Sequence, residues 1–197
     1  MSFSSAENYS YFECDQLALK VGDDATFTRD DCIGSIEVER ETKTVTKKCR
    51  GVTKKRKTKP TGNGTITVKL HIKLELYRKL YGWTNTGLQA GVYALDNTNA
   101  MPEAVLVARV KDEDDNIMYI GYPRCKVEEI NKLSIENGAE EVAEVEMKLS
   151  YMPDDYNKGE YQALAVELTG STVTSDNWMT SFSSSLMQAA SGVSGTS

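Results

Sequence analysis

Residues 33–82 read IGSIEVERETKTVTKKCRGVTKKRKTKPTGNGTITVKLHIKLELYRKLYG, and the rest of the chain is best understood from this stretch. Apolar and polar residues alternate from Ile33 to Glu41 and again from Thr65 to Lys73. Because successive side chains of a strand point to opposite faces, this alternation predicts two half-buried strands. Apolar residues then recur at helical spacing from Leu74 to Tyr81, and Gly82 follows them, so we predict a short helix.

Between the two strands lies a basic arm, residues 40–59, which holds ten of the chain's 23 Lys and Arg residues. They are Arg40, Lys43, Lys47, Lys48, Arg50, Lys54, Lys55, Arg56, Lys57 and Lys59. With its single acid, Glu41, the arm has a formal charge of +9, whereas the remaining 13 bases and 28 acids give −15. An acidic body and a basic arm on identical chains attract each other, which predicts self-assembly. The Thr and Val residues among the bases favour a long hairpin or a strand-flanked loop over 40–60.

The length of 197 residues and the apolar fraction of 40% fit one domain with extensions. We expect a core domain over 13–170, an N-terminal arm over 1–12 and a Ser-rich tail over 171–197. The aromatic residues of the N-terminal arm either dock on a neighbouring subunit or belong to a frayed terminus. The tail is expected to be mobile until bound, with candidate anchors at Trp178, Phe182, Leu186 and Met187. No secretory signal and no membrane anchor are expected.

Further alternating runs predict most of the remaining strands. They lie at 14–21, 103–111, 117–127, 141–151 and 161–168, with a short strand at 92–95 and a hairpin turn at 112–116. Seven or eight strands, one helix and no βαβ alternation predict a mainly β fold. We expect an antiparallel β-sandwich or barrel with one flanking α-helix and a long basic loop.

The residue types that carry catalysis are scarce in this chain. The only histidine, His71, falls on the polar face of a predicted strand. The four cysteines (Cys14, Cys32, Cys49 and Cys125) form no CxxC pair, and we expect them to be reduced and half-buried. No nucleophile elbow or phosphate-binding loop is present. We therefore expect no catalytic residue, no metal site and no cofactor, and a protein that is not an enzyme.

The order of these motifs resembles that of a known family. An early strand, a long charged loop, the strand TITVKLHIK and the helix LYRKLYG are followed by IMYIGYPRCKVEEI and EVEMKLSYMPDDYNKGEYQALAVEL. This layout over residues 12–170 resembles the major tail proteins, or tail tube proteins, of long-tailed siphophages with the phi13-like pattern. The lysine density of the arm and the Ser-rich tail depart from the family.

The resemblance implies a β-sandwich-like subunit that forms hexameric rings, which stack into a tube in the virion after assembly in the host cytoplasm. It implies as partners the chain itself, the tape measure protein and tail terminator or tip proteins, with DNA only in transit. By this resemblance the ten bases of the arm lie at the subunit and ring interface. A tube that conducts DNA should repel phosphates, so the candidate lumen-facing acids are Glu37, Glu39, Glu144 and Glu146.

The alternative is a β-module that binds nucleic acid or another polyanion through residues 40–59. The arm is basic enough for this role, but it contains no aromatic residue on which a base would stack. The tetrapeptide KKRK is also compatible with a nuclear localisation signal on composition alone. Self-assembly predicts that the arm contacts another copy of the chain, whereas the alternative predicts that it contacts a polyanion such as nucleic acid.

Overall fold

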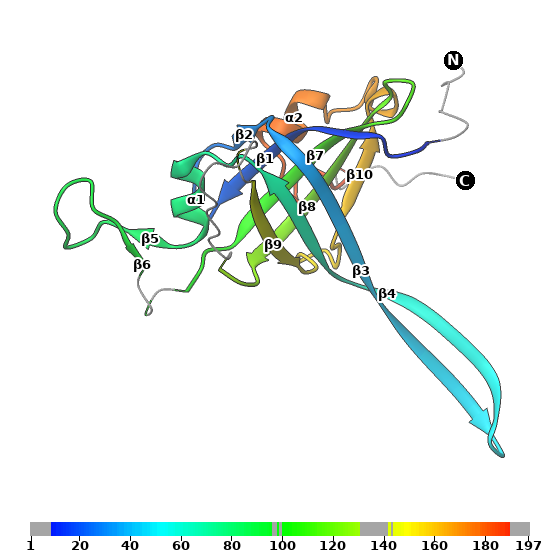
Figure 1. Cartoon of the computed structure of the whole chain (residues 1–197). Coiled ribbons are helices and arrows are strands. Elements are labelled where there is room, and N and C mark those ends of the chain that lie inside the picture. The colour runs from blue at the N-terminus through cyan, green and yellow to red at the C-terminus, as the bar shows by residue number, and fades with distance from the viewer. Residues whose placement is uncertain (1–8, 96–97, 99, 131–141, 143, 190–197) are drawn as a thin grey trace.

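The computed structural model describes residues 9–95, 98, 100–130, 142 and 144–189, and its fold is mainly antiparallel β (Figure 1). The strands are β1 (Glu13–Val21), β2 (Thr28–Asp30), β3 (Ile33–Cys49), β4 (Val52–Leu70), β5 (Trp83–Thr84), β6 (Ala94–Leu95), β7 (Ala104–Lys111), β8 (Ile117–Val127), β9 (Val145–Tyr151) and β10 (Tyr161–Leu164). The helices are α1 (Leu74–Leu80), the single-turn 3₁₀ helix η1 (Ala165–Leu168) and α2 (Ser175–Thr180). None of the described helices is long and apolar enough to cross a membrane.

Eight strands form one sheet in the order β2-β1-β7-β8-β9-β4-β3, and β10 pairs with β8 beside this path. All of its strand pairs are antiparallel. β3, at one edge, packs near β1 without pairing to it, so the sheet curls most of the way into a barrel. β5 and β6 form a separate two-stranded sheet that projects beyond α1 (Figure 1).

The core lies inside this curl, because one face of each strand is apolar. Ile66 and Val68 of β4 are paired with Leu149 and Met147 of β9, and all four side chains are fully buried. The inner face of the first strand contributes Leu17 and Leu19, and α1 adds its own buried leucines to the same cluster. The alternation seen in the sequence is therefore the pattern of one buried and one exposed sheet face.

A second apolar cluster covers the other face of β1, β7 and β8. Trp178 and Phe182, in and just after α2, are buried there against Ala18, Val107 and Tyr119. The Thr174 side chain accepts a hydrogen bond from the Asn177 N–H and so caps α2. These three strands are consequently buried on both faces, which makes them the most enclosed part of the sheet.

The predicted antiparallel β architecture, its eight strands and the flanking helix after residue 73 are confirmed. The hairpin turn at 112–116 is also confirmed, because the Asp112 carboxylate accepts hydrogen bonds from the N–H groups of Asp114 and Asn116. Residues 1–8 of the expected N-terminal arm, 141 and 143 of the predicted strand 141–151, and 190–197 of the expected tail lie outside the described residues.

Four expectations need correction. The chain has a second α-helix, α2, inside the segment for which we expected a mobile tail, and it is packed on the sheet through Trp178. Of the two forms left open for the basic arm, the hairpin is correct, and the long basic loop expected for the fold is a continuation of the sheet. The predicted strand 161–168 ends at Leu164, where η1 begins. All four cysteines are free, but Cys32 and Cys49 are exposed rather than half-buried.

Candidate assembly interface

The basic arm forms a β-hairpin that extends well beyond the body (Figure 1). β3 and β4 stay paired as far as Cys49 and Val52, and only Arg50 and Gly51 connect them. Both connecting residues have positive φ angles, 49° and 77°, as a two-residue turn with the twist of a type I′ turn requires. β9 pairs with β4 only from Gly64 onward, so the outer hairpin has no neighbouring strand.

One face of the outer hairpin is a lysine face, which we define as Lys43, Lys47, Lys55, Lys57 and Lys59 around Val45. Lys43 lies directly opposite Lys59, and Lys47 lies directly opposite Lys55. Like charges in directly opposed positions destabilise a strand pair. The other face carries Thr44 and Thr58, whose hydroxyl oxygens lie 3.0 Å apart. The lysine face therefore needs negative charge from elsewhere to offset its own repulsion.

The described part of the chain does not supply that charge. Among the described residues, none of the nine bases from Lys43 to Lys59 forms an ion pair. The single acid of the arm, Glu41, instead accepts hydrogen bonds from Thr61 and Asn63 near the base of the hairpin. A two-stranded hairpin with neither face packed is only marginally stable. An acidic surface on another molecule would supply the missing charge.

The tenth base, Arg40, has a different role and fixes the base of the hairpin to the body. Its guanidinium donates two hydrogen bonds to the Glu160 carboxylate, at 2.8 and 2.7 Å. The hydrogen bond to Glu160 raises the pKa of Arg40. Nearby, a Cβ at Gly159 would lie 1.8 Å from the Gly62 carbonyl oxygen, so the two backbones are in direct contact. We call the segment 152–160 the clamp, because it holds the hairpin where it leaves the sheet.

Three of the four candidate lumen acids lie on one exposed face of β3, β4 and β9, which we call the acidic face. The register aligns Glu37 with Thr67 and Lys148, and it aligns Lys69 with Glu146. Glu39 is two residues from Glu37 on the same strand and therefore shares its side. The fourth acid, Glu144, precedes β9, and its carboxylate lies over Gly34 at the start of β3.

The acidic face is not uniformly negative, because two of its lysines are paired with acids. Lys69 lies 3.6 Å from Glu146, and Lys148 lies 3.2 Å from Glu128. The hydrogen bond to Glu128 raises the pKa of Lys148. Glu37 and Glu39 are exposed and form no ion pair within the described chain. The unbalanced negative charge of this face is therefore on β3.

The single histidine of the chain lies on the surface. His71 lies just after β4 and is exposed, and its backbone N–H donates to the Cys32 carbonyl oxygen at 3.0 Å. Over the described ranges, no three His, Cys, Asp or Glu side chains gather as a metal ion would require. The clamp has no signal in the sequence, because its key contact joins two glycine backbones almost a hundred residues apart.

Comparison with known proteins adds a limited likeness. No family model and no curated protein matches this chain. Two solved structures are similar in fold. One is the tube-terminating cap of the anti-feeding prophage, at 11% identity and a TM-score of 0.48, covering 82% of this chain and 96% of that one. The other is from the sixfold-symmetrised baseplate of the anti-feeding prophage, at 8% identity and a TM-score of 0.42, covering 83% and 97%. At these values the likeness establishes neither a family nor a function for this chain.

Proposed function

We propose that this protein is a structural subunit of a phage tail, which assembles with copies of itself into stacked, hexameric rings that form the tail tube. The role is structural rather than enzymatic. The observation that carries the proposal is the basic hairpin: it projects from an acidic body, and nine of its bases have no ion-pair partner in the described chain. Identical copies supply both the basic hairpin and the acidic surface that it needs.

In this proposal the hairpin of one subunit lies on an acidic surface of its neighbour in the ring or in the next ring. The clamp at Arg40 and Gly159 sets the direction in which the hairpin leaves the body. A preset direction reduces the ordering cost of docking, because the hairpin does not have to search for its orientation. Long-range attraction between unlike charges then raises the rate of encounter and makes it sensitive to salt.

The acidic face, with Glu37, Glu39 and Glu146, lines the lumen in the proposed tube, and Glu144 lies beside it. Each phosphate that a cationic wall neutralises adds affinity for DNA. A wall with unpaired carboxylates repels phosphates instead, so the DNA in transit slides past it. The tape measure protein, which occupies the same lumen, and tail terminator or tip proteins at the tube ends are the further proposed partners.

The test is negative-stain electron microscopy of the purified full chain, at rising protein concentration and from about 50 mM to about 1 M salt. Rings or tubes that become scarce as salt rises are the expected result. A variant with Lys43, Lys47, Lys55 and Lys57 changed to Gln should assemble poorly at every salt concentration. A control changes Lys73 and Lys126, which lie outside the hairpin and the clamp, to Gln and should assemble normally. A wild-type protein that remains monomeric at low salt and high concentration would contradict the proposal.

Binding of nucleic acid through the hairpin is the second candidate, and the lysine face favours it, because five cations on one side suit a phosphate backbone. The acidic body and the absence of aromatic residues from 40–59 argue against it. Titration of the protein with duplex and single-stranded DNA separates the two functions. Tight, salt-dependent binding by a protein that never assembles would favour the second candidate, whereas negligible binding would remove it.

A further inference from the structure

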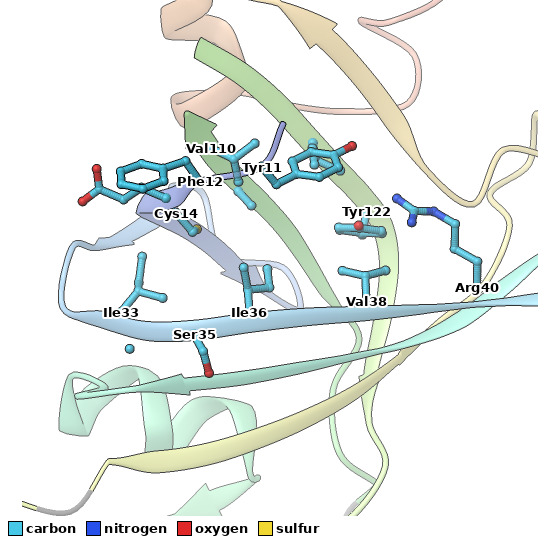
Figure 2. A pocket seen from close by; sticks show the side chains of 14 residues that line it. Tyr11, Phe12, Cys14, Ile33, Ser35, Ile36, Val38, Arg40, Val110 and Tyr122 are labelled. Carbon is cyan, nitrogen blue, oxygen red and sulfur yellow. The ribbon is translucent and has the colours of Figure 1, made fainter. Parts of the chain in front are cut away.

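A groove of about 610 Å³ opens between β1 and β3, where the curled sheet does not close. Figure 2 shows Ile33, Ile36 and Val38 projecting from β3 into this groove, with Tyr11 and Phe12 on the opposite wall. Phe12 is 75% exposed although it is one of the largest apolar side chains of the chain. The floor is formed by apolar residues of β7 and β8. The groove therefore exposes apolar side chains to solvent, with Glu13, Ser35 and Arg40 as its polar lining residues.

One polar feature indicates that the groove is incomplete in a single chain. Among the described strands, β3 pairs only with β4, so its second edge is open along the groove between Ile33 and Arg40. An open strand edge gains hydrogen bonds when another polypeptide covers it.

An exposed loop elsewhere on the chain has the composition that such a groove would accept. Residues 83–95 contain no charged residue, in a chain of which 26% of residues are charged. Within this loop the large apolar side chains of Leu88, Val92, Tyr93 and Leu95 are all exposed, by 38 to 51%. Depletion of charge and exposure of large apolar side chains are the features that mark the core of a protein interface.

The loop is held in one shape although it projects from the body. The Asn85 side-chain amide donates hydrogen bonds to the carbonyl oxygens of Gln89 and Val92. The Arg78 guanidinium of α1 stacks on the Tyr93 ring at 3.9 Å from its centroid. Because this order exists before any contact is made, docking of the loop would cost less conformational entropy than docking of a free segment.

The loop and the groove lie on different sides of the molecule. In Figure 1 the loop between β5 and β6 projects beyond α1 at the left, whereas the described start of the chain, which forms one wall of the groove, lies at the right. The occupant suggested by this arrangement is the loop of a second copy. A contact between two different surfaces of identical subunits is head-to-tail, and such contacts close into rings when the rotation allows.

We propose that the loop 83–95 of one subunit inserts Leu88 and Val92 into the groove between β1 and β3 of the next subunit. This inference rests on the proposed function and adds the apolar contact that holds neighbouring subunits, beside the electrostatic contact of the hairpin. The loop is the apolar anchor, and its backbone faces the open edge of β3. The contact is dry at its centre and therefore depends little on salt.

Two exposed substitutions test the contact without disturbing the core. Leu88→Ser on the loop and Phe12→Ser on the groove should each raise the concentration at which rings form by at least about tenfold. In the double variant, the concentration at which rings form should rise by much less than the product of the two single increases, because both substitutions remove the same contact. Leu74→Ser is the matched control, since Leu74 is an exposed leucine outside the loop. This variant should form rings at the same concentration as wild type.

A photo-cross-linker at position 92 identifies the partner surface directly. In an equal mixture of unlabelled and ¹⁵N-labelled protein, adducts between the two isotopic forms should join residue 92 to 11–14 or to 33–38. Adducts only within one chain, or to another surface, would overturn the inference while the proposed assembly stood. The same holds if Leu88→Ser rings form as readily as those of wild type. A wild-type chain that never assembles would instead overturn the proposed function, and this contact with it.

Discussion

Asp15, on β1, is a single residue whose charge contributes to stability in a way that pH can reveal. Its carboxylate accepts two hydrogen bonds from the Arg109 guanidinium, both at 2.8 Å, and lies 2.9 Å from the Lys111 ammonium. Burial alone would raise the pKa of Asp15, but the hydrogen bonds from Arg109 and Lys111 outweigh it, so the pKa lies below the usual 3.8. The ionised carboxylate therefore stabilises the fold above the pKa of the unfolded chain, and this contribution is lost as pH falls through the lower, folded pKa.

Replacing Asp15 with Asn should lower the free energy of unfolding by about 2 kcal/mol at pH 7, because two cations lose their partner. Urea denaturation at pH values from about 7 down to about 2 measures this difference. The gap to wild type should be constant above the usual carboxyl pKa and should shrink below it. Glu13→Gln, at an exposed neighbouring position, is the control and should change little. A gap that stays the same at every pH would show that the Asp15 charge is not responsible.

Gly159 tests the clamp at the base of the hairpin. A methyl group there would meet the Gly62 carbonyl at 1.8 Å, so Gly159→Ala has to push the clamp away from β4. Overpacking of this kind costs about 1–3 kcal/mol. We expect a lower urea midpoint and fewer rings by electron microscopy. Asp155→Ala, at an exposed position in the same segment, should match wild type in both measurements. Unchanged stability in Gly159→Ala would mean that the clamp does not hold the hairpin in solution.

At the scale of elements, the outer hairpin pairs with no strand of the body among the described residues. Its removal should therefore prevent assembly and leave folding intact. Replacing Lys43–Lys59 with Asn-Gly leaves Thr42 and Pro60 paired at the base and closes them with a favourable turn. The free energy of unfolding should then stay within about 0.5 kcal/mol of wild type. Rings should be absent by electron microscopy at all salt concentrations. If the shortened chain assembles normally, the hairpin is not the assembly element.

The elements that could be predicted from the sequence are those with a clear pattern of apolar residues. β8 spans Ile117–Val127, as predicted, and the inner halves of β3 and β4 follow the apolar alternation between residues 33 and 73. The sequence did not decide between a hairpin and a loop for the outer part of the basic arm, because Thr and Lys alternate there without an apolar face. α2 was missed, because its polar residues mask two buried side chains, Trp178 and Met179. Whether the bases of the arm meet another subunit stays a prediction, since that contact lies between chains.

At the scale of the whole molecule, the acidic face should become inaccessible to large reagents when a tube forms. The test variant is Glu39→Cys in a Cys32→Ser, Cys49→Ser background. Of the two remaining natural thiols, Cys125 is buried, and burial raises the pKa of Cys14 to about 12, so both react slowly. Mass spectrometry then measures labelling at residue 39 by a small maleimide and by a polymer-linked one.

We expect both reagents to label the unassembled protein and only the small one to label tubes, because a polymer coil chosen to be wider than the lumen cannot enter it. The unassembled sample is the matched control for intrinsic reactivity. Equal labelling of tubes by the polymer-linked reagent would place residue 39 on the outside of the tube. In that case the acidic face would be a docking surface for the hairpin rather than the lumen wall.

The unbroken register of the hairpin from Thr42 to Lys47 has a consequence for how its length can change during evolution. Val45 lies directly opposite Lys57, and successive residues of each strand point to opposite sides. Loss of one such opposed pair would turn all lysines beyond it to the other side of the molecule. Loss of two adjacent pairs would keep their side and shorten the reach by roughly 7 Å. Insertions and deletions that preserve assembly should therefore occur in steps of four residues, two in each strand.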